Sequence, residues 1–194
     1  MDMRVAVVGG GSWGTTVAHL TAHNAPTVLY TRREDVAAAV NDQHMNPRYL
    51  AGYALHDDLS ASTDLAAVVS KADVLVMGVP SSGFRQTLVD VRPHLRSRVP
   101  VVSLAKGFEI GSRKRMTQLV AEEVPGHPVG VLTGPNLAKE ILGGSAAAAV
   151  LAFDDLAIAE RLQDVFSSEL FRVYSSTDVV GCELGGALKN VIAL

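Results

Sequence analysis

The residues nearest the amino terminus have the types and spacing that could bind a dinucleotide. Gly9, Gly11 and Gly14 follow the pattern G-x-G-x-x-G, directly after an apolar run over residues 3–8. The first glycine allows a sharp turn, the second lets backbone approach a pyrophosphate, and the third lets a helix pack closely on a strand. The N–H groups at the start of that helix then face the anion. Because a chain with 17 glycines produces this spacing by accident, the prediction depends on the strand before it and the helix after it.

Two arginines follow the next predicted strand, over residues 27–31. A NAD-specific site usually carries an acidic residue there, about 20 residues beyond the glycines, to bind the ribose hydroxyls. This chain has Arg32 and Arg33 instead. Guanidinium groups form charge-assisted hydrogen bonds with phosphate oxygens, so the pair favours the 2′-phosphate of NADPH, with NADH as the alternative. On the other interpretation, both arginines only begin the next helix on a solvated face.

Two lysines could assist the reduction of a carbonyl group. Lys106 follows a predicted buried strand over 99–104, at the sheet edge where open α/β sheets bind ligands. Lys189 lies in a predicted helix over 180–194, and an ammonium there could stabilise the developing oxyanion and supply a proton. Burial and the charge of Lys106 would lower the pKa of Lys189 toward neutrality, whereas a carboxylate at Glu183 would oppose this change. In the alternative, each lysine is an ordinary surface residue.

Three glycines interrupt the predicted helix that carries Lys189. Each costs about 1 kcal/mol relative to alanine, and close approach of a backbone or a ligand is the usual compensation. Asp178 is the expected N-cap, and the spacing places Glu183, Gly186 and Asn190 along one face. The three glycines are Gly181, Gly185 and Gly186.

Strand and helix patterns alternate along the chain, which predicts a doubly wound, mostly parallel α/β sheet. Continuous apolar runs indicate strands that are buried on both faces, and Asp64 is the expected cap of a short helix ending at residue 69. Residues 80–82 are expected to form a loop over the cofactor. The other strands are expected over residues 73–79, 129–132, 145–153 and 171–174. The other helices are expected over residues 34–40, from 84, and over 112–123 and 155–167.

The composition excludes several classes of protein. The hydrophobic content is 48% and the charged content 19% of 194 residues, which is typical of a globular protein. The net charge of −3 gives no indication of a nucleic-acid partner. No apolar run approaches the roughly 20 residues of a membrane helix, and the amino terminus is no signal peptide. Since Cys182 is the single cysteine and cannot form an internal disulfide, we expect a cytoplasmic protein without membrane insertion.

Four motifs, taken together and in order, resemble the NAD(P)-dependent glycerol-3-phosphate dehydrogenases of bacterial type. Residues 9–15, 105–107, 134–140 and 183–191 read GGGSWGT, AKG, GPNLAKE and ELGGALKNV. This family pairs an amino-terminal Rossmann-type domain with a carboxyl-terminal helical domain. The resemblance implies that residues 1–176 form the NAD(P)-binding domain. Residues 177–194 would be the first helix of a truncated all-α substrate domain, whose remainder is absent.

The resemblance also implies reversible hydride transfer between NAD(P)H and dihydroxyacetone phosphate, which gives sn-glycerol 3-phosphate for phospholipid synthesis. No metal ion is implied. Gly10 and Asn136 depart from the Ala and Ser that many members carry. Cofactor contacts are implied for Gly9, Gly11, Ser12, Trp13, Gly14, Arg32, Arg33, Lys106 and Ala138. Substrate contacts are implied for Lys106, Gly134, Asn136 and Lys189, with Lys189 as the catalytic proton carrier.

The same resemblance sets expectations for the whole protein. We expect a homodimer at full length, and we expect this chain alone to bind NADPH with little or no turnover, because the second domain holds the substrate phosphate in this family. Two alternatives stay open. One is a related two-domain reductase of the 3-hydroxyacid or 6-phosphogluconate dehydrogenase type, and the other is a non-catalytic dinucleotide-binding module.

Overall fold

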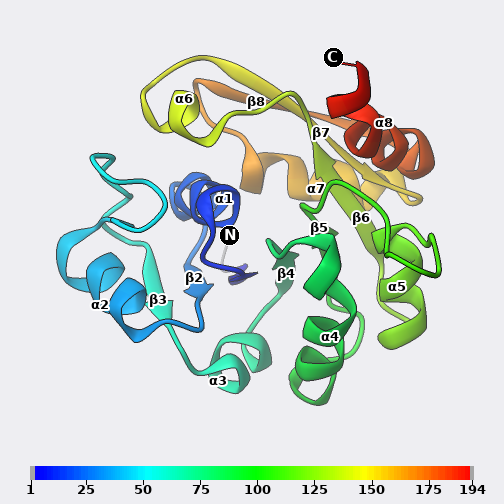
Figure 1. The fold of residues 1–194 in the computed structure, drawn as a ribbon, viewed down its shortest axis with the longest axis horizontal. Coiled ribbons are helices and arrows are strands. Elements are labelled where there is room, and N and C mark those ends of the chain that lie inside the picture. Colours follow the sequence, from blue (N-terminus) through cyan, green and yellow to red (C-terminus); the bar gives the residue numbers. More distant parts are fainter. Residues whose placement is uncertain (1–2, 193–194) are drawn as a thin grey trace.

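The computed structural model describes residues 3–192, in which strands and helices alternate as expected (Figure 1). The strands are β1 (Val5–Val8), β2 (Thr27–Tyr30), β3 (Ser60–Ser62), β4 (Val74–Met77), β5 (Val101–Ser103), β6 (Val129–Thr133), β7 (Ala147–Phe153) and β8 (Phe171–Ser176). The helices are α1 (Ser12–Ala22), α2 (Glu34–Gln43), α3 (Leu65–Ser70), α4 (Ser81–Val91), a short 3-10 turn (Arg92–His94), α5 (Met116–Glu123), α6 (Ala138–Leu142), α7 (Leu156–Phe166) and α8 (Val179–Ile192).

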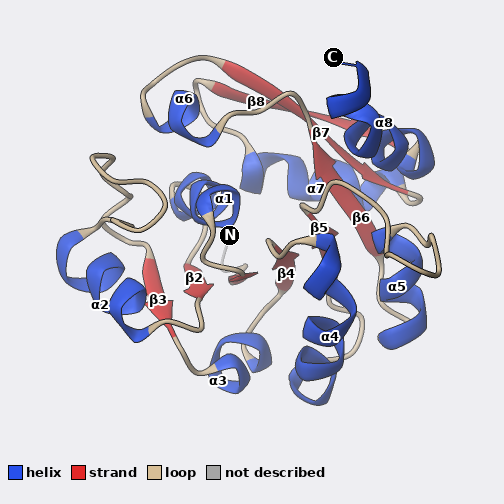
Figure 2. Ribbon diagram, viewed as in Figure 1, coloured by secondary structure: helices blue, strands red, loops and turns tan. Residues whose placement is uncertain are grey.

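All eight strands form one sheet, in the order β3-β2-β1-β4-β5-β6-β7-β8. Every neighbouring pair is parallel except β6 and β7, which run antiparallel. Helices cover the sheet, and α8 lies beside β6 and β7 (Figure 2). The prediction of a doubly wound, mostly parallel α/β sheet of Rossmann type is therefore confirmed.

The core fills both faces of the sheet because side chains alternate along each strand. In β1, Val5 and Val7 belong to the apolar cluster on the side of α1, α2 and α7. Ala6 and Val8 belong to the cluster on the side of α3, α4 and α5. All residues of β1, β4 and β5 are buried. These buried parallel strands hold the loops at their carboxyl ends in fixed positions.

The aspartate caps hold where the sequence predicts them. Asp64 accepts a hydrogen bond from the Ala67 N–H at 2.9 Å, and Asp178 accepts one from the Gly181 N–H at 2.8 Å. These bonds satisfy N–H groups that a helix start otherwise leaves without partners. Within residues 3–192, no helix is long and apolar enough to span a membrane.

Three boundaries differ from the sequence prediction. Strand β3 is not predicted from the sequence, because its three residues, Ser-Ala-Ser, carry no apolar pattern. Helix α4 begins at Ser81 rather than at residue 84, so residues 80–82 form a helix start and no separate loop. Helix α5 begins at Met116 rather than at residue 112, because Phe108 and Arg115 pair as an antiparallel bridge and residues 108–115 turn back on themselves.

Three histidines gather where α1 meets the segment between α2 and β3. The His56 N–H donates to His19 Nδ1 at 2.9 Å, so the neutral His19 ring carries its proton on Nε2. The rings of His23 and His56 lie 4.2 Å apart. Burial, and then the neighbouring charges of His23 and His56, lower the pKa of His19 to about 4. Among the described residues, no group of three or more His, Cys, Asp or Glu side chains could hold a metal ion.

The His19 pKa predicts a loss of stability in mild acid. The unfolded chain binds a proton near the ordinary histidine pKa of 6.5, whereas folded His19 resists protonation until about 4. His19 therefore contributes stability above pH 6.5, and this contribution falls as the pH drops toward 4. Because the ring is partly exposed, we expect a loss of about 1 to 2 kcal/mol. Urea unfolding between pH 7 and pH 4 should show a flatter profile for His19→Gln than for wild type.

The matched control is His94→Gln, since His94 lies in the 3-10 turn and outside the histidine cluster. This variant should keep the wild-type pH dependence of the unfolding free energy. If His19→Gln kept the wild-type pH dependence of the unfolding free energy, the proposed contribution of His19 to stability would be contradicted.

Candidate functional site

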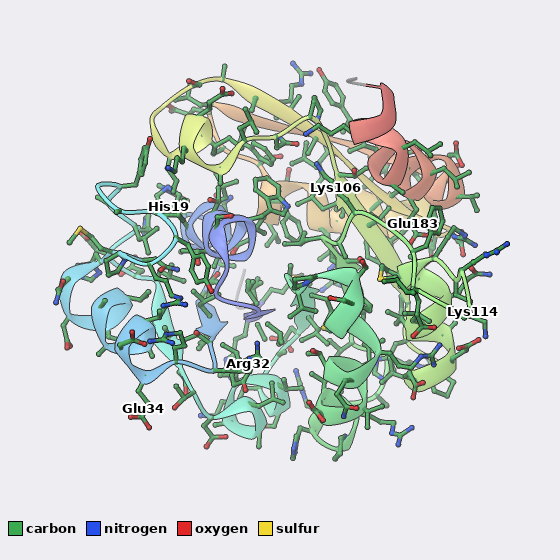
Figure 3. The ribbon with its side chains drawn as sticks, viewed as in Figure 1. His19, Arg32, Glu34, Lys106, Lys114 and Glu183 are labelled. Carbon is green, nitrogen blue, oxygen red and sulfur yellow. The ribbon has the colours of Figure 1, made fainter. Side chains whose placement is uncertain are left out.

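The predicted site residues come to one edge of the sheet, because β1, β4, β5 and β6 are parallel and end there. Residues 9–11 follow β1, residues 78–80 follow β4, residues 104–107 follow β5 and residues 134–136 follow β6. Arg32 lies by β2, while Lys106 lies toward α8 (Figure 3). A long cofactor could therefore extend along this edge between the two residues.

The glycine loop after β1 has the geometry that its spacing predicts. Gly9 has a φ of +127°, and a Cβ there would lie 2.5 Å from the Gly78 carbonyl oxygen. A Cβ on Gly14 would overlap the carbonyl oxygen of Gly9, so any side chain would push α1 away from the turn. A Cβ on Gly11, in contrast, would meet nothing within 4 Å. Packing explains the first and third glycines, and the open space at Gly11 is where a ligand could approach the backbone.

The start of α1 fits an anion. Gly11 is the N-cap and offers no side-chain acceptor, and the first turn has no acidic residue. The N–H groups at Ser12 and Trp13 therefore lack the usual capping partner and lie at the positive end of the helix dipole. The indole of Trp13 packs edge-on against Phe171 at 6.4 Å, and its buried Nε1 has no hydrogen-bond partner among the described residues. Cofactor contact through the Trp13 backbone is thus compatible with a structural role for its ring.

Two further residues support this loop, and the sequence analysis missed both. Asn46 donates from Nδ2 to the Gly10 carbonyl oxygen at 3.1 Å and to Thr15 Oγ1 at 2.9 Å. A Cβ on Gly10 would lie 2.9 Å from Cβ and Oγ1 of Thr31. Thr31 therefore explains why this chain has glycine at position 10. No sequence pattern marks Asn46, because its role depends on a contact over 36 residues.

The two arginines differ in the structure. Arg33 forms two hydrogen bonds with Asp35, at 2.8 and 2.7 Å, and both side chains are largely exposed. The Arg33 guanidinium lowers the pKa of Asp35. Within residues 3–192, Arg32 has no ion-pair partner and is exposed. Exposed pairs such as that of Arg33 are weak, so both guanidinium groups are available to a phosphate. Their contact with a 2′-phosphate stays a prediction.

Lys106 lies at the other end of the edge. Its Nζ donates to the Gly134 carbonyl oxygen at 2.7 Å. Burial, and then the nearby charge of Lys189, lower the pKa of Lys106. The structure thus brings together Lys106, Gly134 and Lys189, which the sequence analysis had assigned to the substrate.

A pocket of about 470 Å³ opens between the end of β6 and helix α8. A larger cavity of about 800 Å³ lies at the opposite edge of the sheet, beside Val74 and Val99, and contains no predicted site residue. We therefore take the smaller pocket as the candidate site, since it contains Gly134 and Lys189. It is lined by Thr133, Gly134, Pro135, Val150, Gly181, Cys182, Gly185, Gly186 and Lys189.

Each of the three glycines in α8 has a different structural environment. A Cβ on Gly181 would overlap the Asp178 carboxylate that caps the helix. A Cβ on Gly186 would lie 2.8 Å from Thr133 Oγ1, so glycine there lets α8 approach the end of β6. Gly185 meets nothing within 4 Å and lines the pocket. Close approach therefore accompanies the glycine at position 186, and the neighbour is the Thr133 side chain rather than a backbone or a ligand.

The structure places Glu183 in a cluster with α5. Its carboxylate is buried and accepts hydrogen bonds from Arg115 Nη1 at 2.6 Å, from the Thr117 N–H at 3.0 Å and from Thr117 Oγ1 at 2.5 Å. Helix geometry places Glu183 and Lys189 about 120° apart around α8. The carboxylate is therefore paired with Arg115 and lies on a different side of α8 from Lys189. The side chain of Asn190 lies outside the described residues.

The segment after β6 holds the remaining predicted residues. Asn136 donates from Nδ2 to the Ala148 carbonyl oxygen at 3.0 Å, while its buried Oδ1 has no partner among the described residues. A Cβ on Gly134 would overlap the Asn136 side chain, so glycine is required there. Ala138 begins α6, which contacts α1. Contacts of these residues with cofactor or substrate stay predictions.

Comparisons with known proteins agree with this geometry. Over 194 residues, the chain is 54% identical to a protein of Sphingopyxis alaskensis named glycerol-3-phosphate dehydrogenase (NAD(P)+) 2, and it covers 58% of that protein. It is 52% identical to glycerol-3-phosphate dehydrogenase (NAD(P)+) 1 of Mycobacterium tuberculosis, of which it covers 57%. The chain thus spans less than two thirds of the length of these relatives.

A solved structure and a family model complete the comparison. The chain superposes on glycerol-3-phosphate dehydrogenase from Coxiella burnetii with a TM-score of 0.91 and 30% identity, covering 99% of this chain and 59% of the other. Residues 4–159 match the family described as NAD-dependent glycerol-3-phosphate dehydrogenase N-terminus. The chain therefore belongs to the NAD-dependent glycerol-3-phosphate dehydrogenase family, whose amino-terminal part it matches.

Proposed function

We propose that this chain binds NADPH and serves the reversible reduction of dihydroxyacetone phosphate to sn-glycerol 3-phosphate. One observation carries the proposal: the open start of α1 and the pair Lys106 and Lys189 lie along the same edge of the sheet. An anion site and a proton donor at one edge are what a nicotinamide-dependent ketone reduction needs. The family match favours this proposal over a reductase of the 3-hydroxyacid or 6-phosphogluconate dehydrogenase type, and over a non-catalytic module.

The residues of the glycine loop would hold the cofactor, which supplies the hydride when it is bound. The N–H groups of Ser12 and Trp13 would donate to the pyrophosphate, and Gly11 would leave space for it. Arg32 and Arg33 would bind the 2′-phosphate, which favours NADPH, while NADH remains the alternative. Ala138 and Lys106 would contact the cofactor farther along the edge.

The two lysines would manage charge on the substrate. As the ketone oxygen gains negative charge, the ammonium of Lys189 would stabilise it and donate the proton. Lys106, held by the Gly134 carbonyl oxygen, would place a second cation beside the substrate. Burial and the nearby charge of Lys189 lower the pKa of Lys106, so its ammonium is a stronger acid than that of an exposed lysine. Asn136 would hold a substrate hydroxyl, as the resemblance implies.

The organisation of the whole protein belongs to the same proposal. We assign residues 1–176 to the NAD(P)-binding domain and residues 177–194 to the beginning of a helical substrate domain. The expected homodimer and the cytoplasmic location are also part of this proposal. The substrate is a small molecule, in agreement with the names of the relatives.

The glycine loop gives a paired prediction on cofactor binding. Gly14→Ala should destabilise the fold by about 2 to 4 kcal/mol, because its Cβ overlaps the Gly9 carbonyl oxygen. Gly11→Ala should cost less than about 1 kcal/mol of stability, yet weaken NADPH binding at least about tenfold by filling the space for the pyrophosphate. Urea unfolding and titration of NADPH fluorescence measure the two effects. Full NADPH affinity in a folded Gly11→Ala variant would contradict the proposed cradle.

The reaction can be tested in a chimera that joins this chain to the part of the Sphingopyxis alaskensis relative beyond the matched segment. The chimera should reduce dihydroxyacetone phosphate with NADPH, and Lys189→Met should lower kcat by about 10²- to 10⁴-fold while the Kd for NADPH changes less than about twofold. The chain alone should bind NADPH with little or no turnover.

Lys71→Met is the matched control, because Lys71 is exposed at the end of α3 and far from the pocket in sequence. It should keep the activity of the chimera. Either a folded, NADPH-binding chimera without reductase activity or a fully active Lys189→Met variant would refute the proposed function. Repeating the assay with NADH tests the cofactor preference.

A further inference from the structure

Glu183 is the one acidic or basic residue that is buried among residues 3–192. Only 6% of its side chain is exposed, and Arg115, its ion-pair partner, is itself largely covered. A buried carboxylate is costly unless hydrogen bonds satisfy it, and Glu183 accepts three. All three donors come from Arg115 and Thr117, at the start of α5 and nearly 70 residues earlier in the chain. This cluster therefore fastens α8 to α5 at one defined point.

Arg115 also lies at the end of the turn that follows Lys106. Phe108, two residues after Lys106, pairs with Arg115 as an antiparallel bridge. The Arg115 N–H donates to Gln118 Oε1 at 3.0 Å, which fixes Arg115 at the first turn of α5. The same residue thus closes the turn after Lys106 and holds the carboxylate of α8.

The turn after Lys106, over residues 108–115, is also held by contacts with α4 and α5. Arg85 of α4 forms two hydrogen bonds with Glu109, at 2.6 and 2.9 Å, and further ion pairs with Glu122 and Glu123 of α5. This network holds the turn against α4 and α5, and none of its described hydrogen bonds or ion pairs reaches α8. Among the described ion pairs, the pair of Arg115 with Glu183 is the one that joins this region to α8.

Further along α8, Gly186 and Lys189 follow Glu183 at successive turns. A Cβ on Gly186 would lie 3.7 Å from Cγ of Lys106, so the helix runs directly past the Lys106 side chain. A small rotation or withdrawal of α8 would therefore change the separation of the two lysines. The hydrogen bonds at Glu183 oppose such a movement, because they tie α8 to the start of α5.

We propose that Glu183, with Arg115 and Thr117, is a positioning residue that sets the placement of Lys189 relative to Lys106. The inference rests on the proposed function for its importance to the reaction. Glu183 touches neither lysine and acts through the position of α8. Figure 3 shows Glu183 on α8, on the same side of the molecule as Lys106.

The test uses the reactivity of Lys106 in this chain, measured by mass spectrometry after brief labelling with acetic anhydride over a range of pH. In the wild type, α8 covers Lys106 and brings the charge of Lys189 near it, and both effects lower its pKa. In Glu183→Gln we expect the labelling midpoint of Lys106 to move to higher pH by at least about 0.5. Thermal unfolding of the same samples shows that the variant is folded.

A milder pair of variants keeps the test decisive if Glu183→Gln does not fold. Thr117→Val has the shape of threonine without the hydroxyl that donates to Glu183, whereas Thr117→Ser keeps the hydroxyl. Thr117→Val should move the labelling midpoint of Lys106 in the same direction as Glu183→Gln. Thr117→Ser should keep the wild-type midpoint. Glu160→Gln, at an exposed position on α7, should leave it unchanged.

The outcomes separate this inference from the proposed function. Wild-type labelling midpoints in folded Glu183→Gln or in Thr117→Val would overturn the positioning role, whatever the reaction. In the chimera, Glu183→Gln should lower kcat at least about tenfold with an unchanged Kd for NADPH. A chimera without reductase activity would count against the proposed function, and the labelling result would still decide the placement of α8.

Discussion

The contact of three glycine backbones, at Gly9, Gly14 and Gly78, is the constraint on which the site depends. A Cβ on Gly14 would overlap the Gly9 carbonyl oxygen, and a Cβ on Gly78 would lie 3.0 Å from Cα of Gly14. The absence of side chains lets α1 start directly above the ends of β1 and β4. As a result, the positive end of the helix dipole reaches the sheet edge where the parallel strands deliver their loops.

The two ends of this sheet edge carry basic side chains in different environments. Near β2, the exposed Arg32 and Arg33 offer charge to a phosphate, and near α8 the partly buried Lys106 has a lowered pKa beside Lys189. These environments suit different tasks, because a guanidinium offers paired N–H groups to phosphate oxygens, whereas burial makes an ammonium a stronger acid. The glycine loop lies between the two ends, as the proposed binding of one extended cofactor requires.

Local pattern was enough to predict most of the fold, and long-range contacts account for what it missed. Buried strands such as β4 show as unbroken apolar runs, and caps such as Asp64 and Asp178 act within three residues. Strand β3 has no such pattern, because its pairing with β2 defines it. In the site, spacing identified the glycines and lysines, but the partner of Glu183 lies 68 residues away. The carboxylate of Glu183 is therefore paired with Arg115, which no local pattern could indicate.

A crystal structure of this chain with NADPH would show whether the sheet edge binds the cofactor as proposed. We expect the pyrophosphate within hydrogen-bonding distance of the Ser12 and Trp13 N–H groups, which is about 2.7 to 3.2 Å between heavy atoms. We also expect the 2′-phosphate beside Arg32 or Arg33 and the nicotinamide toward Lys106. A dinucleotide bound elsewhere on the molecule, or a pyrophosphate that does not touch the start of α1, would contradict the proposed binding mode.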